Sequence, residues 1–275
     1  MIEVPLRLVA DEDDPGLFLP YVVVEIDGVP VEALLDSGAS RTHVVDRPGL
    51  VTREASARAS SSAFGAGTSV NRTATVACRL GGVDLPVDAA VVPPDHPGHG
   101  DLVGQDVLSR FRCGYRLADG LLLLDPDLPG DSSAIYLDHT MHVSLDVAWE
   151  DGPTASAAFD TGASITVVDQ AFADRHPELF RPAGTSAGSD ATGATAETPM
   201  AVMRGPEILG VSFGDAAVAI VDLSGANSTL RRPMDLILGW TVTSQATWII
   251  DHTAARASCV RRPTGHLGGE PLQAV

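Results

Sequence analysis

The sequence predicts an all-β protein built from two similar lobes. Short runs rich in Val, Ile and Leu alternate with Gly, Pro, Asp and Ser, a pattern typical of β-strands joined by turns. Few segments have the periodicity of a long amphipathic helix. A nine-residue segment that begins at Asp36 returns at Asp160, and this repeat indicates that the chain contains the same β-unit twice.

Each expected element is an apolar run bounded by turn-forming residues. In the first half the expected strands are 21–26, 29–35, 73–80, 87–92 and 121–124. In the second half they are 142–148, 154–159, 216–221 and 247–250. Two short helices are also expected, at 107–111, after a glycine, and at 169–176, where Pro177 ends the helix.

Length and composition fit a folded protein that needs no cross-links. The 275 residues are 44% hydrophobic and 20% charged, which excludes a disordered chain. No apolar run approaches the roughly 20 residues that a membrane-spanning helix requires. The net charge of −18 argues against binding to nucleic acid or to anionic lipid surfaces. All 18 basic residues are Arg, so catalysis by a lysine amine is excluded.

The cysteines and the first residues of the chain favour a cytoplasmic location. Cys78, Cys113 and Cys259 are odd in number and widely spaced. We therefore expect small buried side chains in a reducing compartment rather than a disulfide framework or a zinc site. Residues 1–16 lack the basic and apolar regions of a secretory signal.

The internal repeat extends well beyond its centre. Residues 36–44 and 160–168 are identical at six of nine positions, and a seventh position exchanges Ser for Thr. In each half the glycine of an Asp-Gly pair, the strongest short hairpin signal, lies eight residues before the repeated Asp. Three later features also recur, namely a Gly hairpin at 81–82 and 214–215, an apolar-apolar-Gly triplet at 102–104 and 237–239, and a closing strand at 121–125 and 248–251.

A polar linker divides the two copies. Residues 125–133 are rich in Asp, Pro, Gly and Ser, as the exposed linkers between domains often are. We therefore expect an N-terminal lobe at 1–130 and a C-terminal lobe at 131–275, with a flexible tail after about residue 255.

Asp-(Ser/Thr)-Gly-Ala after an apolar strand, followed downstream by the apolar-apolar-Gly triplet, resembles a lobe of an aspartic peptidase. Ala in the fourth position is more similar to the retropepsin-like branch than to pepsin. The resemblance covers residues 20–125 and 140–252. It implies the bilobal acid-protease fold, with two β-barrel-like lobes and the active site between them. It also implies that Asp36 and Asp160 are the catalytic pair of an aspartic endopeptidase.

Two adjacent carboxyl groups can hydrolyse a peptide without a metal or a nucleophilic side chain. They cannot both ionise at close range, so they share one proton. The ionised group takes a proton from water, and the protonated group donates to the substrate oxygen. Ala39 and Ala163 follow the two triplets and donate no side-chain hydrogen bond, so we expect higher pKa values and a working range nearer neutral pH than in pepsins. The alternative interpretation of Asp36 and Asp160 is a pair of turns at strand ends.

The resemblance also implies supporting residues around the pair. Ser37 and Thr161 would bond across to the opposite lobe, unless they are ordinary turn hydroxyls. Gly38 and Gly162 would let the backbone approach the carboxylates closely because they lack Cβ, and the triplets that end in Gly104 and Gly239 would lie beneath the loops. Turn geometry alone is the alternative for these glycines. Two threonines, each six residues past a repeated Asp, would support the loops, namely Thr42 and Thr166.

The family also has flaps, which are Gly-rich hairpin tips that close over substrate. The first candidate spans 62–69 and includes Phe64, Gly65 and Gly67. The second spans 189–195 and includes Gly193. Ordinary flexible loops are the alternative for both segments.

Nothing in the sequence requires a metal or a cofactor. His96 and His99, like His139 and His142, lie near aspartates, but their spacing gives no convincing ligand geometry. The expected partner is a peptide or protein substrate, with no nucleic acid and no membrane. One chain would act as a monomer because it supplies both carboxyls. The alternative function is a catalytically silent bilobal peptide-binding protein, and a chaperone-like peptide binder would use the same cleft.

Overall fold

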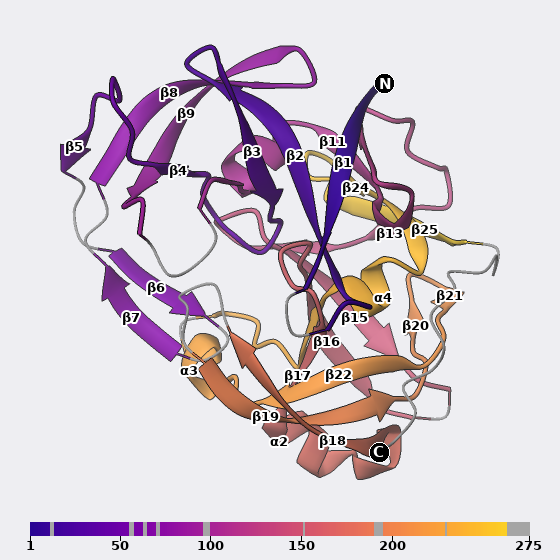
Figure 1. Cartoon of the computed structure of the whole chain (residues 1–275). Helices are drawn as coiled ribbons and strands as arrows, with labels where there is room; N and C mark the ends of the chain where they lie inside the picture. Colours follow the sequence, from indigo (N-terminus) through magenta and orange to yellow (C-terminus); the bar gives the residue numbers. More distant parts are fainter. Residues whose placement is uncertain are drawn as a thin grey trace.

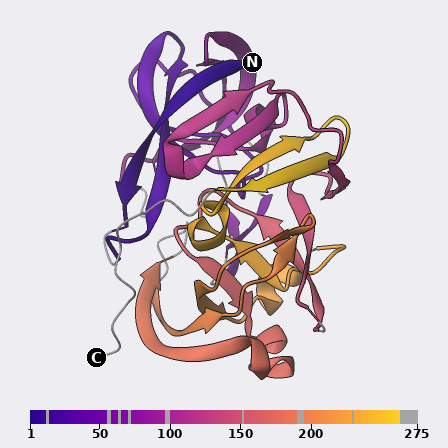
Figure 2. The same ribbon diagram turned by 90° about the vertical axis from the view of Figure 1, so that its right-hand side faces the viewer.

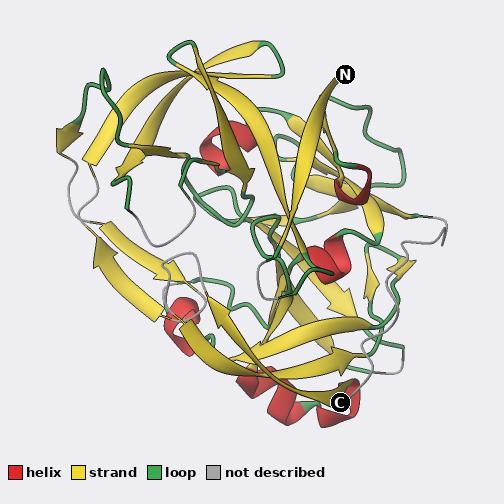
Figure 3. Ribbon diagram, in the orientation of Figure 1, coloured by secondary structure: helices red, strands yellow, loops and turns green. Residues whose placement is uncertain are grey.

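The structure, a computed structural model, describes residues 1–11, 14–54, 58–62, 65–69, 72–95, 100–150, 152–189, 195–228 and 230–262. Strands hold 52% of the chain and helices 11%, so the protein is all-β, as the sequence predicted. Figures 1 and 3 show twisted strands in two large groups, with short helices beside them. Within the described ranges no helix is long and apolar enough to cross a membrane.

Most strands of the first half lie in the upper part of Figure 1, whereas β6 (Arg58–Ser62) and β7 (Gly65–Ser69) lie at the lower left beside α3 (Ser224–Asn227). Asp36, the first of the two repeated Asp residues, directly follows the third strand of this half. In chain order the elements are β1 (Ile2–Ala10), β2 (Phe18–Ile26), β3 (Val29–Leu35), β4 (His43–Val45), β5 (Arg53–Glu54), β6 (Arg58–Ser62), β7 (Gly65–Ser69), β8 (Arg72–Leu80), β9 (Val83–Val92), β10 (Leu102–Val103), α1 (Gln105–Leu108), β11 (Arg112–Arg116), the 3₁₀ helix η1 (Leu117–Asp119) and β12 (Leu121–Leu124).

The second half repeats this plan with longer connections. Its elements are β13 (Ser133–Ala134), β14 (Tyr136–Leu137), β15 (Val143–Ala148), β16 (Thr154–Phe159), β17 (Thr166–Asp169), α2 (Gln170–Arg175), η2 (Pro177–Leu179), β18 (Phe180–Ser189), β19 (Thr195–Met203), β20 (Glu207–Ile208), β21 (Val211–Ser212), β22 (Ala216–Val221), α3 (Ser224–Asn227), β23 (Leu236–Leu238), α4 (Trp240–Thr243), β24 (Ala246–Asp251) and β25 (Arg256–Arg261). The nine expected strands and the two expected helices are confirmed, with ends that differ by up to four residues.

The same pairing of strands occurs in both lobes. In the first lobe β3 runs parallel to β10, β10 antiparallel to β4, and β4 parallel to β9. In the second lobe β16, β23, β17 and β22 repeat these pairings in the same order and direction. Each repeated Asp therefore follows a strand that is hydrogen bonded to the strand of the apolar-apolar-Gly triplet.

Strands from both halves of the chain join in one sheet between the lobes. The order β13–β25–β24–β11–β12–β1 places the end of the chain beside strands of the first half. Figure 2 shows the yellow strands β24 and β25 next to the magenta strands of the first half. An ion pair between Arg112 Nε and Asp251 Oδ2, 2.7 Å apart, joins β11 to β24. The sheet thus ties the two lobes together independently of the site.

The expectation of a flexible tail after about residue 255 is wrong for residues 256–261. These residues form β25, which pairs along its whole length with β24. Ala257 and Cys259 are buried there, so the segment gains apolar burial that an unpaired tail would lack. Residues 263–275 lie outside the described part of the chain.

Aromatic packing connects the lobes directly behind the second repeated Asp. Phe159 is fully buried, and its ring centroid lies 5.2 Å from that of Tyr115 and 5.3 Å from that of Trp248. Because Phe159 immediately precedes Asp160, this contact fixes the position of Asp160 relative to the first lobe. The three cysteines are free and buried, as the sequence predicted.

Candidate active site

Asp36 and Asp160 occupy equivalent positions at the ends of β3 and β16. The Asp36 N–H donates to the carbonyl of Val103 at 3.0 Å, and the Asp160 N–H donates to that of Leu238 at 3.1 Å. Both acceptors belong to the strand of an apolar-apolar-Gly triplet. The parallel pairing therefore determines where each Asp leaves its strand.

Each carboxyl group lies against the glycine of the opposite lobe. A Cβ atom added to Gly38 would lie 2.4 Å from Cγ of Asp160, and one added to Gly162 would lie 2.6 Å from Cγ of Asp36. Side chains cannot approach this closely, so only glycine fits at either position. Two backbone N–H groups, of Gly38 and Ala39, donate to Asp36 Oδ1 at 2.9 Å each, and the Gly162 N–H donates to Asp160 Oδ1 at 2.8 Å. The repeat thus brings the two carboxyls together across the lobe boundary.

Reciprocal hydrogen bonds lock the two Asp loops to each other. The hydroxyl of Ser37 donates to the Phe159 carbonyl at 3.0 Å and accepts the Thr161 N–H at 2.9 Å. The hydroxyl of Thr161 donates to the Leu35 carbonyl at 2.5 Å and accepts the Ser37 N–H at 3.0 Å. Both side chains are almost fully buried, so water does not compete for these bonds.

The glycines of the two triplets pack against the main chain of the Asp loops. A Cβ atom on Gly104 would lie 2.6 Å from the Arg41 carbonyl oxygen, and one on Gly239 would lie 2.3 Å from that of Ile165. Their N–H groups donate to two fully buried threonine hydroxyls, Gly104 to Thr42 at 3.2 Å and Gly239 to Thr166 at 3.1 Å. Each loop is therefore supported from below in the same way.

Burial raises the pKa of both carboxyls, and the charge of Asp160 raises that of Asp36 further. Asp36 is 8% exposed, and burial, followed by the charge of Asp160, raises its pKa to about 8. Burial also raises the pKa of Asp160, although the Gly162 N–H and the nearby ring of His142 oppose the shift. Two carboxyls this close titrate as a pair, so they hold one proton between them over a wide pH range.

Both flap candidates are flanked by paired antiparallel strands, and the tips of both lie outside the described residues. Gly65 and Gly67 lie in β7, which pairs with β6. This hairpin contacts α3 of the second lobe, as Figure 1 shows. Phe64 and Gly193 lie outside the described residues, and β18 and β19 are the long paired strands that flank Gly193.

The histidine clusters do not form a metal centre in the described structure. His96 and His99 lie outside the described residues. Nδ1 of His142 lies 3.2 Å from Oδ2 of Asp138, a hydrogen-bonded pair rather than a set of ligands. Among the described residues, no group of three or more His, Cys, Asp and Glu could hold a metal ion.

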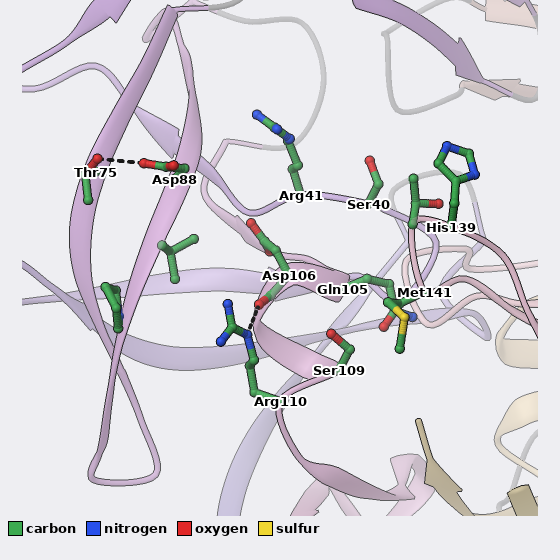
Figure 4. A pocket seen from close by; sticks show the side chains of 13 residues that line it. Ser40, Arg41, Thr75, Asp88, Gln105, Asp106, Ser109, Arg110, His139 and Met141 are labelled. Carbon is green, nitrogen blue, oxygen red and sulfur yellow. Dashed lines mark hydrogen bonds between the residues drawn. The ribbon is translucent and has the colours of Figure 1, made fainter. Parts of the chain in front are cut away.

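A polar cavity of about 560 Å³ lies beside the first Asp loop. Its lining comes from the loop after Ala39, from β8 and β9, from α1 and from the turn before β15 (Figure 4). Two of its charged groups already have partners: Asp88 accepts the Thr75 hydroxyl at 2.6 Å, and Arg110 Nε donates to the main-chain oxygen of Asp106 at 3.3 Å. Because Asp88 and Asp106 are acidic and Arg110 is basic, the lining of the cavity has both negative and positive side chains beside the site.

Sequence reasoning missed one residue that touches the site. Gln105 is 1% exposed, and its Nε2 donates to the Ser37 carbonyl at 2.8 Å, so α1 supports the first Asp loop. The position of Gln105 directly after the triplet was the available signal.

Comparisons with known proteins agree with this architecture. Residues 22–110 match the family described as gag-polyprotein putative aspartyl protease. No curated protein sequence matches the chain. Among solved structures, the aspartic proteinase from Irpex lacteus matches with a TM-score of 0.54 and 13% identity, over 94% of this chain and 96% of that one. The first lobe therefore carries the sequence signature of the retropepsin-like aspartyl proteases, and the whole chain has the bilobal fold of a pepsin-like aspartic proteinase.

Proposed function

We propose that the chain is an aspartic endopeptidase whose catalytic pair is Asp36 and Asp160. The observation that carries this proposal is the reciprocal locking of the two Asp loops through Ser37 and Thr161, which brings both carboxyls to one point of the lobe boundary. The raised pKa values support it, because a pair that keeps one proton near neutral pH offers a base and an acid together.

The proposed reaction is the direct attack of water on a peptide carbonyl. The ionised carboxylate takes a proton from water while the water oxygen bonds to the carbonyl carbon, and the protonated carboxyl donates to the carbonyl oxygen. The tetrahedral intermediate then breaks its C–N bond as the nitrogen receives the proton that the first carboxylate took from water, and the second carboxyl regains its proton from the hydroxyl as the new carbonyl forms. No bond forms between the chain and the substrate. The burial of the pair favours these proton transfers because fixed groups replace bulk water around them.

The surroundings of the pair suit an extended peptide. The β6–β7 hairpin contacts α3 in the second lobe, which supports a role as a cover over the substrate. We also propose that the substrate is contacted by the flap residues Phe64, Gly65, Gly67 and Gly193. Because one chain supplies both carboxyls, we also propose that it acts as a monomer. We propose separately that it works in the cytoplasm.

A peptide-library cleavage assay between pH 3 and 8 tests this function. Asp36→Asn and Asp160→Asn keep the shape of the side chain but cannot share a proton, so each should lower kcat by about 100-fold or more. Asp222→Asn is the matched control, because Asp222 is an exposed Asp that also accepts a backbone N–H, from Ser224 at 2.9 Å. Its activity should equal that of the wild type.

Three outcomes would contradict the assignment. Normal turnover in either active-site variant would exclude the carboxyl pair. Inhibition by a chelator would point to a metal instead. Peptide binding without cleavage by the wild type would favour the silent peptide-binding protein.

A further inference from the structure

Two arginines and two aspartates line the cavity beside the first Asp loop, and the second lobe has uncharged residues at all four equivalent positions. The duplication identifies these positions. Arg41 and Ile165 each lie five residues past a repeated Asp. The second and sixth residues after each triplet glycine also correspond, as do the residues two before Ala90 and two before Ala219, which occupy the same register beside β4 and β17. The other pairs are therefore Asp106 and Thr241, Arg110 and Gln245, and Asp88 and Ala217.

The fold does not require these charges. Oδ1 of Asp106 accepts the Thr42 N–H at 2.8 Å and the Thr42 hydroxyl at 2.7 Å, which holds the first Asp loop against α1. In the second lobe the hydroxyl of Thr241 accepts the equivalent N–H, that of Thr166, at 3.1 Å. An uncharged hydroxyl therefore supports the loop in the second lobe, and the charges of the first lobe are available for another task.

The boundary between the lobes is also filled differently on its two sides. The register of β2 with β3 and of β15 with β16, continued to the two Asp residues, makes Phe18 and Met141 equivalent. Gln105 and Trp240 are equivalent because each directly follows a triplet glycine. The ring of Phe18 packs on Trp240 of the opposite lobe, with centroids 5.3 Å apart, whereas Met141 and Gln105 line the polar cavity (Figure 4). One side is thus closed by aromatic packing, and the other keeps a polar space of about 560 Å³.

Arg41 is the charged group of this cavity that most needs a partner. Both acids already accept hydrogen bonds, Asp106 from Thr42 and Asp88 from the Thr75 hydroxyl at 2.6 Å. Within the described ranges the side chain of Arg41 makes no hydrogen bond or ion pair, although the charge of Asp106 attracts it. Figure 4 shows its guanidinium extending away from Asp106. A guanidinium has five N–H donors in a planar fork, so an unpaired one suits a carboxylate best.

We propose that the cavity is a subsite for an acidic side chain of the substrate, whose carboxylate pairs with Arg41. The inference rests on the function proposed above and names the class of peptide that the site selects. Ser40 and Arg41 line the cavity four and five residues past Asp36. An extended peptide advances by about 3.3 to 3.6 Å per residue, so the acidic residue lies within a few positions of the cleaved bond.

A positional-scanning library of octapeptides tests the subsite by cleavage at neutral pH. Glu, Gln and Lys are fixed at each position in turn. At one position, on one side of the cleaved bond, Glu should exceed Gln by about 10-fold in kcat/KM, because Gln has nearly the same shape without the charge. Lys should fall below Gln there, because its charge repels that of Arg41. A library without any position that prefers Glu to Gln would overturn the proposal.

Two substitutions of Arg41 and one matched control assign the preference to this side chain. Arg41→Gln should bring the ratio of Glu to Gln at that position to about one, and Arg41→Glu should reverse the preference in favour of Lys. Arg79→Gln is the control, because Arg79 is a 47% exposed arginine of β8 that lies outside the cavity lining and pairs with Asp84 at 3.4 Å. Its ratio should equal that of the wild type. A ratio that survives Arg41→Gln, or that falls equally in Arg79→Gln, would overturn the proposal.

Binding separates this inference from the proposed function. Calorimetry with Asp160→Asn should show that the octapeptide pools with Glu at the selected position bind about 10-fold more tightly than those with Gln, and adding Arg41→Gln should remove the difference. If the wild-type chain cleaves no peptide at any pH, the proposed function fails, and binding of the pools to the wild type decides the subsite alone. Equal binding of the Glu and Gln pools at every position, or no binding of either, would overturn the inference.

Discussion

Thr161→Val removes one hydroxyl from the contact between the lobes and keeps a side chain of nearly the same size. Thr161 is 2% exposed, and its hydroxyl bonds to the Leu35 carbonyl at 2.5 Å and to the Ser37 N–H at 3.0 Å. Valine leaves both main-chain groups buried without these partners. Each such group costs about 1 to 3 kcal/mol. For the two groups together we expect the free energy of unfolding to fall by about 2 to 6 kcal/mol, while the reciprocal bonds of the Ser37 hydroxyl remain.

Denaturant unfolding measures this loss against a matched control. Thr185→Val also removes a hydroxyl, but Thr185 is exposed and its hydroxyl donates to Glu197 at 2.9 Å, so its loss should stay within about 0.5 kcal/mol. We also expect Thr161→Val to lower kcat by about 100-fold, because the two carboxyls lose their fixed spacing. A loss of stability below about 1 kcal/mol, or one equal to that of Thr185→Val, would refute the reasoning.

Three more predictions follow from the geometry. Gly239→Ala places a Cβ atom 2.3 Å from the Ile165 carbonyl oxygen and should lower the midpoint of unfolding. Gly225→Ala is the control, because its added Cβ atom has no other atom within 4 Å and should leave the midpoint unchanged. Equal midpoints for the two variants would contradict this prediction. The pKa of Asp36 is raised from 3.8 to about 8, so its contribution to stability is complete below about pH 4 and is lost as the pH rises through 8. Asp36→Asn should therefore lessen the fall in melting temperature between pH 5 and 8, and parallel curves for the two proteins would disprove it. Size-exclusion chromatography with light scattering should give a single species near the chain mass of 28.5 kDa, and an obligate dimer would contradict the monomer proposal.

The duplicated motif made the centre of the fold predictable. The conformation of the chain around Asp36 and Asp160 depends on local features, namely an apolar strand and then a tight turn with a glycine that lacks Cβ. Such features can be recognised in a short segment of sequence. Two copies in the same register also indicated that the loops would meet. In the structure Ser37 and Thr161 hydrogen bond across the lobes.

Features that depend on distant partners were not predictable. Residues 256–261 resemble a polar tail, and they form a strand only because β24 offers an edge and a buried position for Cys259. Gln105 gave a similar difficulty, because its bond to the Ser37 carbonyl joins residues that are 68 positions apart.

The pH dependence of kcat/KM for the wild-type chain tests most directly whether the two carboxyls share one proton. The account predicts a bell-shaped profile, with an acidic limb where the pair loses its first proton and an alkaline limb near pH 8, because the pKa of Asp36 is raised to about 8. The maximum should lie at mildly acidic to neutral pH. Activity confined to values below about pH 4, or a rate that stays constant well above pH 9, would contradict the shared proton.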